Sequence, residues 1–326
     1  MTSPSPAPRD NARPPALIAL DWGTTALRAW LLAGPGQVLQ ERRSDHGIMH
    51  LPVGGFSEAF ESIGAEWLAA WPRLPVIACG MVGSAQGWRE VPYVRTPADT
   101  TALVAGLTAC EVPGGRTLHI VPGVLDDGPL PDVMRGEETQ IVGASADRST
   151  AASGRALFVL PGTHSKWVAT EAGRIVEFRT FMTGDMYAAL RGHTILGRLM
   201  SDAPQRDGAA FALGVRTGRE QHAKGGLLAS VFSARSLGLV GRLPKDSLAD
   251  YLSGLLIGAE LEGALRLFGA AGADGAREID IVGSETLSAR YVEAFAAAGI
   301  GRAALHPQAS PAGLWHIAAH AGLVAP

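Results

Sequence analysis

The chain has 326 residues, with 28 Lys and Arg against 31 Asp and Glu, 47% hydrophobic residues and 18% charged residues. This composition is that of a soluble globular protein and excludes a disordered or coiled-coil chain, and at roughly 150 residues per domain the length predicts two domains. The formal net charge of -3 argues against nucleic acid or an anionic membrane as a partner, so we expect small molecules to be bound.

The start of the chain and its cysteines indicate where the protein works. Residues 1–15 contain five prolines and no apolar run, which predicts a disordered tail and not a signal peptide. Cys79 and Cys110 are too few for a disulfide framework or a thiolate metal site. The weakly polar stretch 252–273 is interrupted by charged residues, so it predicts a buried helix and not a membrane span. We therefore expect a cytoplasmic protein.

The first elements along the chain form a β-meander. An apolar run at 16–20 ends in a glycine turn, and further strands are predicted at 27–33 and 37–42. The same pattern of strand, glycine turn and two more strands recurs at 157–160, 166–170 and 174–180. This repeat predicts two similar halves, although any α/β protein can contain two meanders of this kind.

Helices and buried strands fill the intervals between these meanders. Helical spacing of apolar residues predicts helices over 56–70, 137–146, 185–191, 209–221 and 248–267. Ser310 followed by Pro311 predicts a helix N-cap and first helical residue. Short apolar runs predict buried strands at 75–79, 117–121 and 279–282. The fold class is therefore α/β, with a first lobe over 16–150, a linker near 147–155, and a second lobe over 151–326.

The turn after the first strand is a candidate phosphate site. The sequence contains no P-loop and no dinucleotide-binding fingerprint, so phosphates need another cradle. A hairpin tip with Gly23, Thr24 and Thr25 offers backbone N–H groups and hydroxyls to phosphoryl oxygens, although such a turn is often only a turn. Asp21 at the strand end is placed to hold hydrated Mg²⁺, and Arg28 to add a charged contact.

These motifs carry a resemblance to known proteins. The pattern Asp21-x-Gly23-Thr24-Thr25-x-x-Arg28 resembles the first phosphate motif of the superfamily of sugar kinases, actin and chaperone ATPases. Further segments are similar to the 2-dehydro-3-deoxygalactonokinase family, namely 45–47, 79–84, 86–88, 131–140, 160–168 and 181–184. The resemblance implies two lobes of the ribonuclease H-like type that close on the substrate, each a mixed sheet that opens with a β-meander and is flanked by helices. It also implies a kinase that uses ATP and Mg²⁺ to phosphorylate the 6-hydroxyl of 2-dehydro-3-deoxy-D-galactonate in galactonate catabolism.

The second half carries the remaining expected nucleotide contacts. The turn after the second meander's first strand predicts donors for the β- and γ-phosphates, although a solvated hairpin tip is the alternative: Gly162, Thr163, His164, Ser165 and Lys166. Pro161 stands where an acid is common in the superfamily, which argues against a second metal-holding carboxylate there. Gly283 and Ser284 follow a strand and precede a helix, and they resemble the superfamily's adenosine segment.

Phosphoryl transfer to a hydroxyl needs an orienting acceptor, and carboxylates are the candidates. Glu137 and Glu138 begin a predicted helix, where acids also complement the helix dipole. Successive helical residues point about 100° apart, so only one of the two can face a cleft fully, and spacing does not select which. Asp132 and Asp185 are the alternatives.

A sugar acid also needs a cation and hydroxyl donors. Arg135 and Arg89 are the candidates for its carboxylate, because a guanidinium suits bidentate carboxylate binding. Other candidate substrate contacts cluster in glycine-rich loops, although each alone is more often core or surface: His46, Gly80, Met81, Ser84 and Trp88.

The sequence thus favours a kinase of a small sugar acid. A phosphohydrolase of polyphosphate or a nucleotide is the alternative that the Gly136-Glu137-Glu138 segment suggests, and a non-catalytic sugar sensor on the same fold is a third. The expected ligands are the sugar acid, ATP and Mg²⁺. The assembly, with a homodimer as one candidate, is left open by the sequence.

Overall fold

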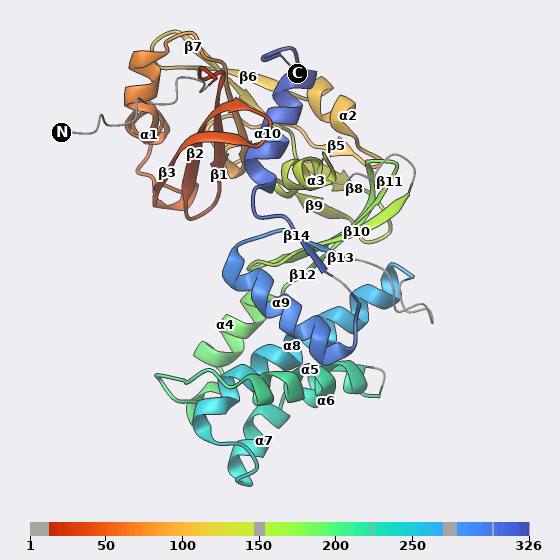
Figure 1. Ribbon diagram of the computed structural model, residues 1–326. Helices are drawn as coiled ribbons and strands as arrows, with labels where there is room; N and C mark the ends of the chain where they lie inside the picture. The colour runs from red at the N-terminus through yellow and green to blue at the C-terminus, as the bar shows by residue number, and fades with distance from the viewer. Residues whose placement is uncertain (1–12, 147–153, 223, 270–278, 302, 326) are drawn as a thin grey trace, which may run out of the picture. The chain divides into compact units, whose positions relative to one another are not determined.

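The structure is a computed structural model that describes residues 13–146, 154–222, 224–269, 279–301 and 303–325. The chain divides into two compact units (Figure 1). Unit 1 comprises residues 1–125, 133–147 and 310–326, and unit 2 comprises 126–132 and 148–309. The predicted tail over 1–12 and the core of the predicted linker, 147–153, lie outside the described residues. The predicted lobes differ from these units in two segments, because 126–132 belong to unit 2 and the C-terminal helix belongs to unit 1.

Unit 1 is built on a six-stranded sheet of order β3-β2-β1-β4-β7-β6. The meander β1-β2-β3 is antiparallel, whereas β4 pairs parallel with β1 and β7 pairs parallel with β4. Every residue of β1 is buried, as its continuous apolar run predicts for a central strand. The strands are β1 (Leu17–Trp22), β2 (Leu27–Gly34), β3 (Gln37–Ser44), β4 (Val76–Gly80), β6 (Thr108–Val112) and β7 (Arg116–Ile120).

Helices and a small sheet complete unit 1. The small sheet has the order β5-β8-β9, and β9 leads through Gly136 directly into α3. Helix α10 packs so closely on α3 that a Cβ at Gly313 would lie only 1.8 Å from the Thr139 carbonyl oxygen. These elements are β5 (Val94–Arg95), β8 (Val124–Asp126), β9 (Asp132–Met134), α1 (Phe56–Ala70), α2 (Thr100–Ala105), α3 (Glu137–Ala146), α10 (Ala309–His320), η1 (Ile48–His50) and η2 (Met81–Gly83).

Unit 2 repeats the strand order of unit 1 around a five-stranded sheet, β12-β11-β10-β13-β14. The meander β10-β11-β12 is again antiparallel, and β13 and β14 follow in parallel. The predicted α/β fold, with two mixed sheets that each open with a β-meander, is confirmed. The strands are β10 (Arg155–Leu160), β11 (Ser165–Glu171), β12 (Arg174–Phe181), β13 (Ile279–Ile281) and β14 (Ala303–Leu305).

Two long helices of unit 2 pack at unusually close range. A Cβ at Gly214 on α5 would lie 2.2 Å from the Tyr251 carbonyl oxygen, and one at Gly254 on α8 would lie 2.1 Å from that of Phe211. Glycine is therefore required at this crossing. The helices of unit 2 are α4 (Thr183–His193), α5 (Gly208–His222), α6 (Gly226–Ser230), α7 (Ser233–Leu239), α8 (Leu248–Leu267), α9 (Glu285–Ala298), η3 (Gly197–Leu199) and η4 (Lys245–Ser247). None of the helices in the described part of the chain has the length and apolarity to span a membrane.

Candidate functional site

Asp21 lies near the carboxyl end of β1 and is 9% exposed. Its Oδ2 accepts a hydrogen bond from Arg28 Nη2 at 2.5 Å, because the two residues are directly opposite on β1 and β2. The same oxygen accepts one from Ser310 Oγ at 3.0 Å. Arg28, expected to contact a phosphate, is thus paired with Asp21 here. Ser310, expected to be an N-cap, lies inside α10, which begins at Ala309, and its hydroxyl serves Asp21 instead.

The first predicted phosphate turn, residues 23–26, follows Asp21. The Gly23 N–H donates to the Ala26 carbonyl at 2.9 Å, which closes a tight turn and leaves Thr24 and Thr25 exposed. The predicted substrate residue His46 is exposed, and its backbone carbonyl accepts the Trp22 Nε1 hydrogen bond at 2.8 Å. The turn therefore presents its hydroxyls to solvent, as a phosphate cradle requires.

Two glycines bring the start of α3 to the ends of β1 and β4. Gly80 ends β4 with φ +93°, and a Cβ there would lie 2.8 Å from the Trp22 carbonyl oxygen and 3.5 Å from Asp21 Oδ1. Gly136, with φ +110°, would place a Cβ 3.2 Å from the Gly80 Cα. Side chains are excluded at both positions, and the glutamates that follow Gly136 are consequently held in the neighbourhood of Asp21.

Glu138 is fully buried and accepts hydrogen bonds from the Gly136 N–H at 2.6 Å and the Thr139 hydroxyl at 2.9 Å. Burial, reinforced by the charge of Glu137, raises the pKa of Glu138 to about 8. Burial and the nearby charges of Asp21 and Glu138 also raise the pKa of the Cys79 thiol. The charges of Asp21 and Glu138 therefore both act on Cys79, which places the two carboxylates in one neighbourhood.

Glu137 has a different environment from its neighbour. It is half-buried, and its Oε2 accepts the Arg135 N–H at 2.9 Å. The expected divergence of the two successive helical residues is thus present in the structure, with Glu138 inside and Glu137 partly in solvent. Neither burial nor hydrogen bonding by itself assigns the reaction to one of them.

The segment before α3 contains a buried cation, Arg135, and two of its donor atoms have no hydrogen-bond partner among the described residues. Arg135 is 9% exposed, its Nη2 donates to the Val91 carbonyl at 2.7 Å, and its guanidinium lies 4.2 Å from the centre of the Tyr93 ring. Within the described residues, the Nε and Nη1 atoms of Arg135 and the Oγ of Ser84 are buried without a hydrogen-bond partner. Unsatisfied buried donors are rare, and each calls for a physical explanation, such as an acceptor supplied by water or an ion. Arg89, the other candidate, is exposed.

Two other predicted substrate residues follow β4. Met81 begins η2 and is half-buried. The Trp88 ring is stacked on Phe56 with centroids 5.9 Å apart and meets Trp22 and Phe60 edge-on. Trp88 therefore contributes to the apolar core of unit 1, and a substrate contact would have to use the part of its surface that stays exposed.

In unit 2 the second predicted phosphate turn, residues 162–165, supports the start of α4. Thr163 and His164 are exposed, and His164 Nε2 lies 2.8 Å from Asp185 Oδ2. The Asp185 N–H donates to the Thr163 carbonyl at 3.1 Å, and a Cβ at Gly184 would lie 2.7 Å from the Gly162 carbonyl oxygen. The N-terminus of α4 is thus packed on the turn, and backbone N–H groups at a helix start favour anions.

The other two predicted phosphate donors of this turn are buried. Ser165 Oγ shares a hydrogen bond of 2.8 Å with the Tyr291 hydroxyl. Lys166 Nζ donates to Thr180 Oγ1 at 2.6 Å and lies 4.0 Å from Asp132 Oδ1. Asp132 also accepts the Thr180 N–H at 2.6 Å. In this structure both Lys166 and Asp132 are therefore engaged within unit 2.

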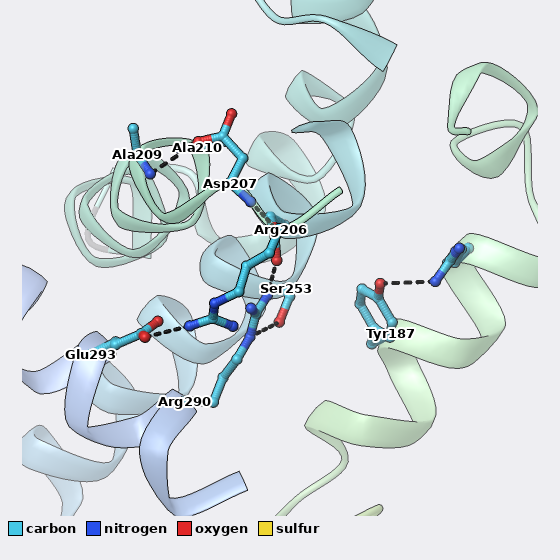
Figure 2. Close-up of polar contacts among 10 residues, drawn as sticks. Tyr187, Arg206, Asp207, Ala209, Ala210, Ser253, Arg290 and Glu293 are labelled. Atoms are coloured by element: carbon cyan, nitrogen blue, oxygen red, sulfur yellow. Dashed lines mark hydrogen bonds and ion pairs between the residues drawn. The ribbon is translucent and has the colours of Figure 1, made fainter. Parts of the chain in front are cut away.

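A cavity of about 360 Å³ opens beside this turn. Gly162, the start of α4 and the facing sides of α8 and α9 line it, with Leu256, Ile257 and Leu287 as its apolar wall. Arg290 forms its polar side, with Nη2 2.5 Å from Asp250 Oδ1 and Nε 3.3 Å from Ser253 Oγ (Figure 2). Asp250, Ser253 and Arg290 are not among the predicted site residues, although the polar pair Asp250 and Ser253 at helical spacing on the apolar α8 could have signalled the cavity.

The predicted adenosine segment lies next to the same turn. Because β13 pairs parallel with β10, the turns that follow both strands meet at one edge of the sheet. A Cβ at Gly283 would lie 3.7 Å from Pro161, and Ser284 is the N-cap residue of α9, the helix that carries Leu287 and Arg290. Gly283 and Ser284 are thus brought together with Gly162 and the cavity.

Comparisons with known proteins agree with one another. The sequence model of the family described as 2-keto-3-deoxy-galactonokinase matches residues 21–317. The 2-dehydro-3-deoxygalactonokinase of Escherichia coli K12 is 37% identical over 286 residues, covering 86% of this chain and 90% of the relative. A Rhizobium meliloti relative provisionally named for the same activity is 39% identical over 301 residues, covering 91% and 94%. A crystal structure of a protein from Sinorhizobium meliloti, also provisionally so named, has a TM-score of 0.83 at 37% identity and covers 93% of this chain and 98% of its own.

Proposed function

We propose that this chain, which belongs to the 2-keto-3-deoxy-galactonokinase family, transfers the γ-phosphoryl group of ATP to the 6-hydroxyl of 2-dehydro-3-deoxy-D-galactonate. The family expected from the sequence motifs is confirmed, and so is the class of carbohydrate kinase. The observation that carries the proposal is the family match over 21–317, which includes both phosphate turns and the α3 segment. A cytoplasmic location and a homodimer stay predictions.

The nucleotide belongs to unit 2 in this proposal. The cavity of about 360 Å³ begins at Gly162 and has an apolar wall and a polar side, which suits a purine and a ribose. The phosphates would extend to the Gly162–Thr163 turn, where the start of α4 offers backbone N–H groups. Gly283 lies next to this turn. Because glycine has no side chain, a ligand bound at the turn can approach the Gly283 backbone closely.

Asp21 is the residue that fits a bound Mg²⁺ ion. Its Oδ2 is already occupied by Arg28 and Ser310, so the carboxylate suits an ion held through water. Among the described residues no three His, Cys, Asp or Glu side chains gather as a metal site, which agrees with an ion shared with phosphate oxygens. When bound, the ion neutralises charge on the transferred phosphoryl group.

The reaction needs an acceptor for the proton of the sugar hydroxyl. The hydroxyl oxygen forms a bond to the γ-phosphorus while the bond from phosphorus to the bridging oxygen of ADP breaks, and the proton passes to a carboxylate. Glu138 suits this role because its pKa is about 8. Its carboxylate also lies in the neighbourhood of Asp21, since the charges of both groups raise the pKa of the Cys79 thiol.

The carboxylate of the sugar acid is assigned to Arg135. A carboxylate would supply the acceptor that the Nη1 atom lacks, and Ser84 offers a second donor from η2. The absence of a side chain at Gly83 lets the guanidinium pack against this turn, because a Cβ there would lie 2.9 Å from Arg135 Nη1. The bound acid would thereby compensate a charge that is costly to bury alone.

Arg135→Met should raise KM for the sugar acid by at least about tenfold, because a hydrogen bond to a charged group is worth roughly 1.5–3 kcal/mol. KM for ATP should stay within about twofold of the parent value, since the change lies in unit 1. Initial rates with each substrate varied separately measure both constants. Arg89→Met is the matched control. A normal sugar-acid KM in Arg135→Met, or a raised one in Arg89→Met, contradicts the assignment.

A coupled ADP-release assay tests the activity across substrate classes. The panel comprises aldonic acids, 2-keto-3-deoxy acids, polyphosphate and a reaction without acceptor. Release that depends on the 2-keto-3-deoxy acid supports the kinase. Release of ADP without acceptor, or of phosphate from polyphosphate, would identify a phosphohydrolase, and absence of turnover with all of them would identify a sensor.

A further inference from the structure

Glu260 is a carboxylate in the core of unit 2 that the proposed reaction does not use. It lies on α8, is 3% exposed, and forms no ion pair with Lys or Arg in the described part of the chain. Burying an acid without a cation costs free energy unless hydrogen bonds satisfy it. A leucine or methionine at this position would avoid that cost, so the acid calls for a further explanation.

Three donors converge on this one carboxylate. Trp167 Nε1 donates to Oε1 at 2.8 Å, and the Tyr291 hydroxyl lies 2.9 Å from Oε1 and 2.8 Å from Oε2. The Thr183 hydroxyl donates to Oε2. Burial raises the pKa of Glu260, and these hydrogen bonds oppose that rise. Both oxygens of the carboxylate thus accept hydrogen bonds from hydroxyl and indole groups, and these bonds fix the orientation of each donor side chain.

The donors come from the elements that form the nucleotide site. Thr183 is the first residue of α4, whose N-terminus packs on the second phosphate turn, and it also lines the cavity. Tyr291 lines the cavity from α9 and shares its hydroxyl with Ser165 of the turn at 2.8 Å. Trp167 follows the turn on β11. A single buried group therefore joins α8 to the turn, to the start of α4 and to α9.

We propose that Glu260 is a positioning residue that fixes the second phosphate turn, the start of α4 and Tyr291 in the geometry that binds the nucleotide. This inference rests on the proposed function, because it assigns the nucleotide to unit 2. Glu260 acts through Thr183, Ser165 and Tyr291 and does not itself touch ATP. Its loss should consequently weaken nucleotide binding without altering recognition of the sugar acid.

Glu260→Gln in the full-length protein tests the inference. The substitution replaces one carboxylate oxygen, an acceptor, by an amide NH₂ group, a donor that faces hydroxyl and indole donors. The hydrogen bonds to residue 260 therefore cannot all be kept. We expect KM for ATP and the dissociation constant of ADP, measured by calorimetry, to rise by about tenfold. KM for the sugar acid should change by less than about twofold. Glu260→Asp, which retains the charge, should recover part of the ADP affinity.

The control is Glu262→Gln on the same helix. Glu262 pairs with Arg219 and Arg266 at 3.3 and 2.9 Å and does not contact the network, so its loss tests general weakening of α8. This variant should leave ADP affinity unchanged even if its melting temperature falls. If Glu260→Gln does not fold, Tyr291→Phe removes only the hydroxyl that joins Glu260 to Ser165, and it should still weaken ADP binding selectively.

The outcomes separate this inference from the proposed function. Unchanged ADP affinity in the folded variants, Tyr291→Phe included, or an equal rise of both KM values, would overturn the positioning role while leaving the kinase intact. Conversely, a wild-type protein that binds ADP but phosphorylates no sugar acid would refute the function, and ADP affinity of the variants would still decide the role of Glu260.

Discussion

Asp21→Asn should lower kcat by at least about 10²-fold, because the substitution keeps the side-chain volume and removes the charge that we propose to hold Mg²⁺. The fold should survive. Arg28, the partner that loses its ion pair, has 40% of its side chain exposed and can be hydrated. Steady-state kinetics at saturating ATP, sugar acid and Mg²⁺, with circular dichroism as the folding control, measure the effect. Near-normal turnover at saturating Mg²⁺ contradicts a catalytic role for Asp21.

Ser310→Ala provides a matched comparison for Asp21. It removes one hydrogen bond to the same oxygen, 3.0 Å long, without changing any charge. Its effect on kcat should therefore be much smaller than that of Asp21→Asn, in line with the roughly 0.5–1.5 kcal/mol of an ordinary hydrogen bond. Equal losses in the two variants would mean that the structure around Asp21, and not its charge, matters.

Glu138→Gln should lower kcat by roughly 10²- to 10⁴-fold, the range expected of a positioned base. Glu137→Gln should lose little, because successive helical residues point about 100° apart and we propose Glu138 as the base. Assays at saturating ATP and sugar acid separate this effect from binding. Equal turnover of both variants and the parent would make the pair an ordinary helix start and direct attention to Asp132 or Asp185.

The pH profile gives an independent check on Glu138. Its pKa is raised to about 8, so the free enzyme holds this carboxyl protonated at neutral pH and ionises it as the pH rises through that value. A base acts only when ionised, so kcat/KM of the parent should rise with pH and level off above about 8. Glu138→Gln should lack this rise. A parent profile that is flat between pH 6 and 9 argues against Glu138 as the base.

Local patterns account for most of the elements. The ranges 56–70, 137–146 and 248–267 match α1, α3 and α8 at both ends, because apolar spacing and turn residues are local signals. The two meanders were recognisable from their glycine turns for the same reason. Strands such as β5, with two residues, depend on distant pairing and carry no such signal.

The site was only partly predictable for a physical reason. Asp21, its turn and the α3 glutamates follow from motifs that are continuous in sequence. Ser310 is 289 residues from Asp21, so no local pattern could reveal its hydrogen bond, and its N-cap assignment was wrong. Lys166 is predicted to bind phosphate because it follows a polar turn, and this role stays a prediction; its hydrogen bond to Thr180 depends on the pairing of β11 with β12, which no local pattern reveals.

The position of the phosphate in the product decides whether the 6-hydroxyl of the sugar acid is the acceptor. The purified protein is incubated with ATP, Mg²⁺ and 2-dehydro-3-deoxy-D-galactonate, and the product is examined by proton–phosphorus correlation spectroscopy. We expect one phosphoester for each ADP formed, with its phosphorus coupled to the C6 protons of the sugar acid. Inorganic phosphate as the sole phosphorus product besides ADP, or coupling to another carbon, would contradict it.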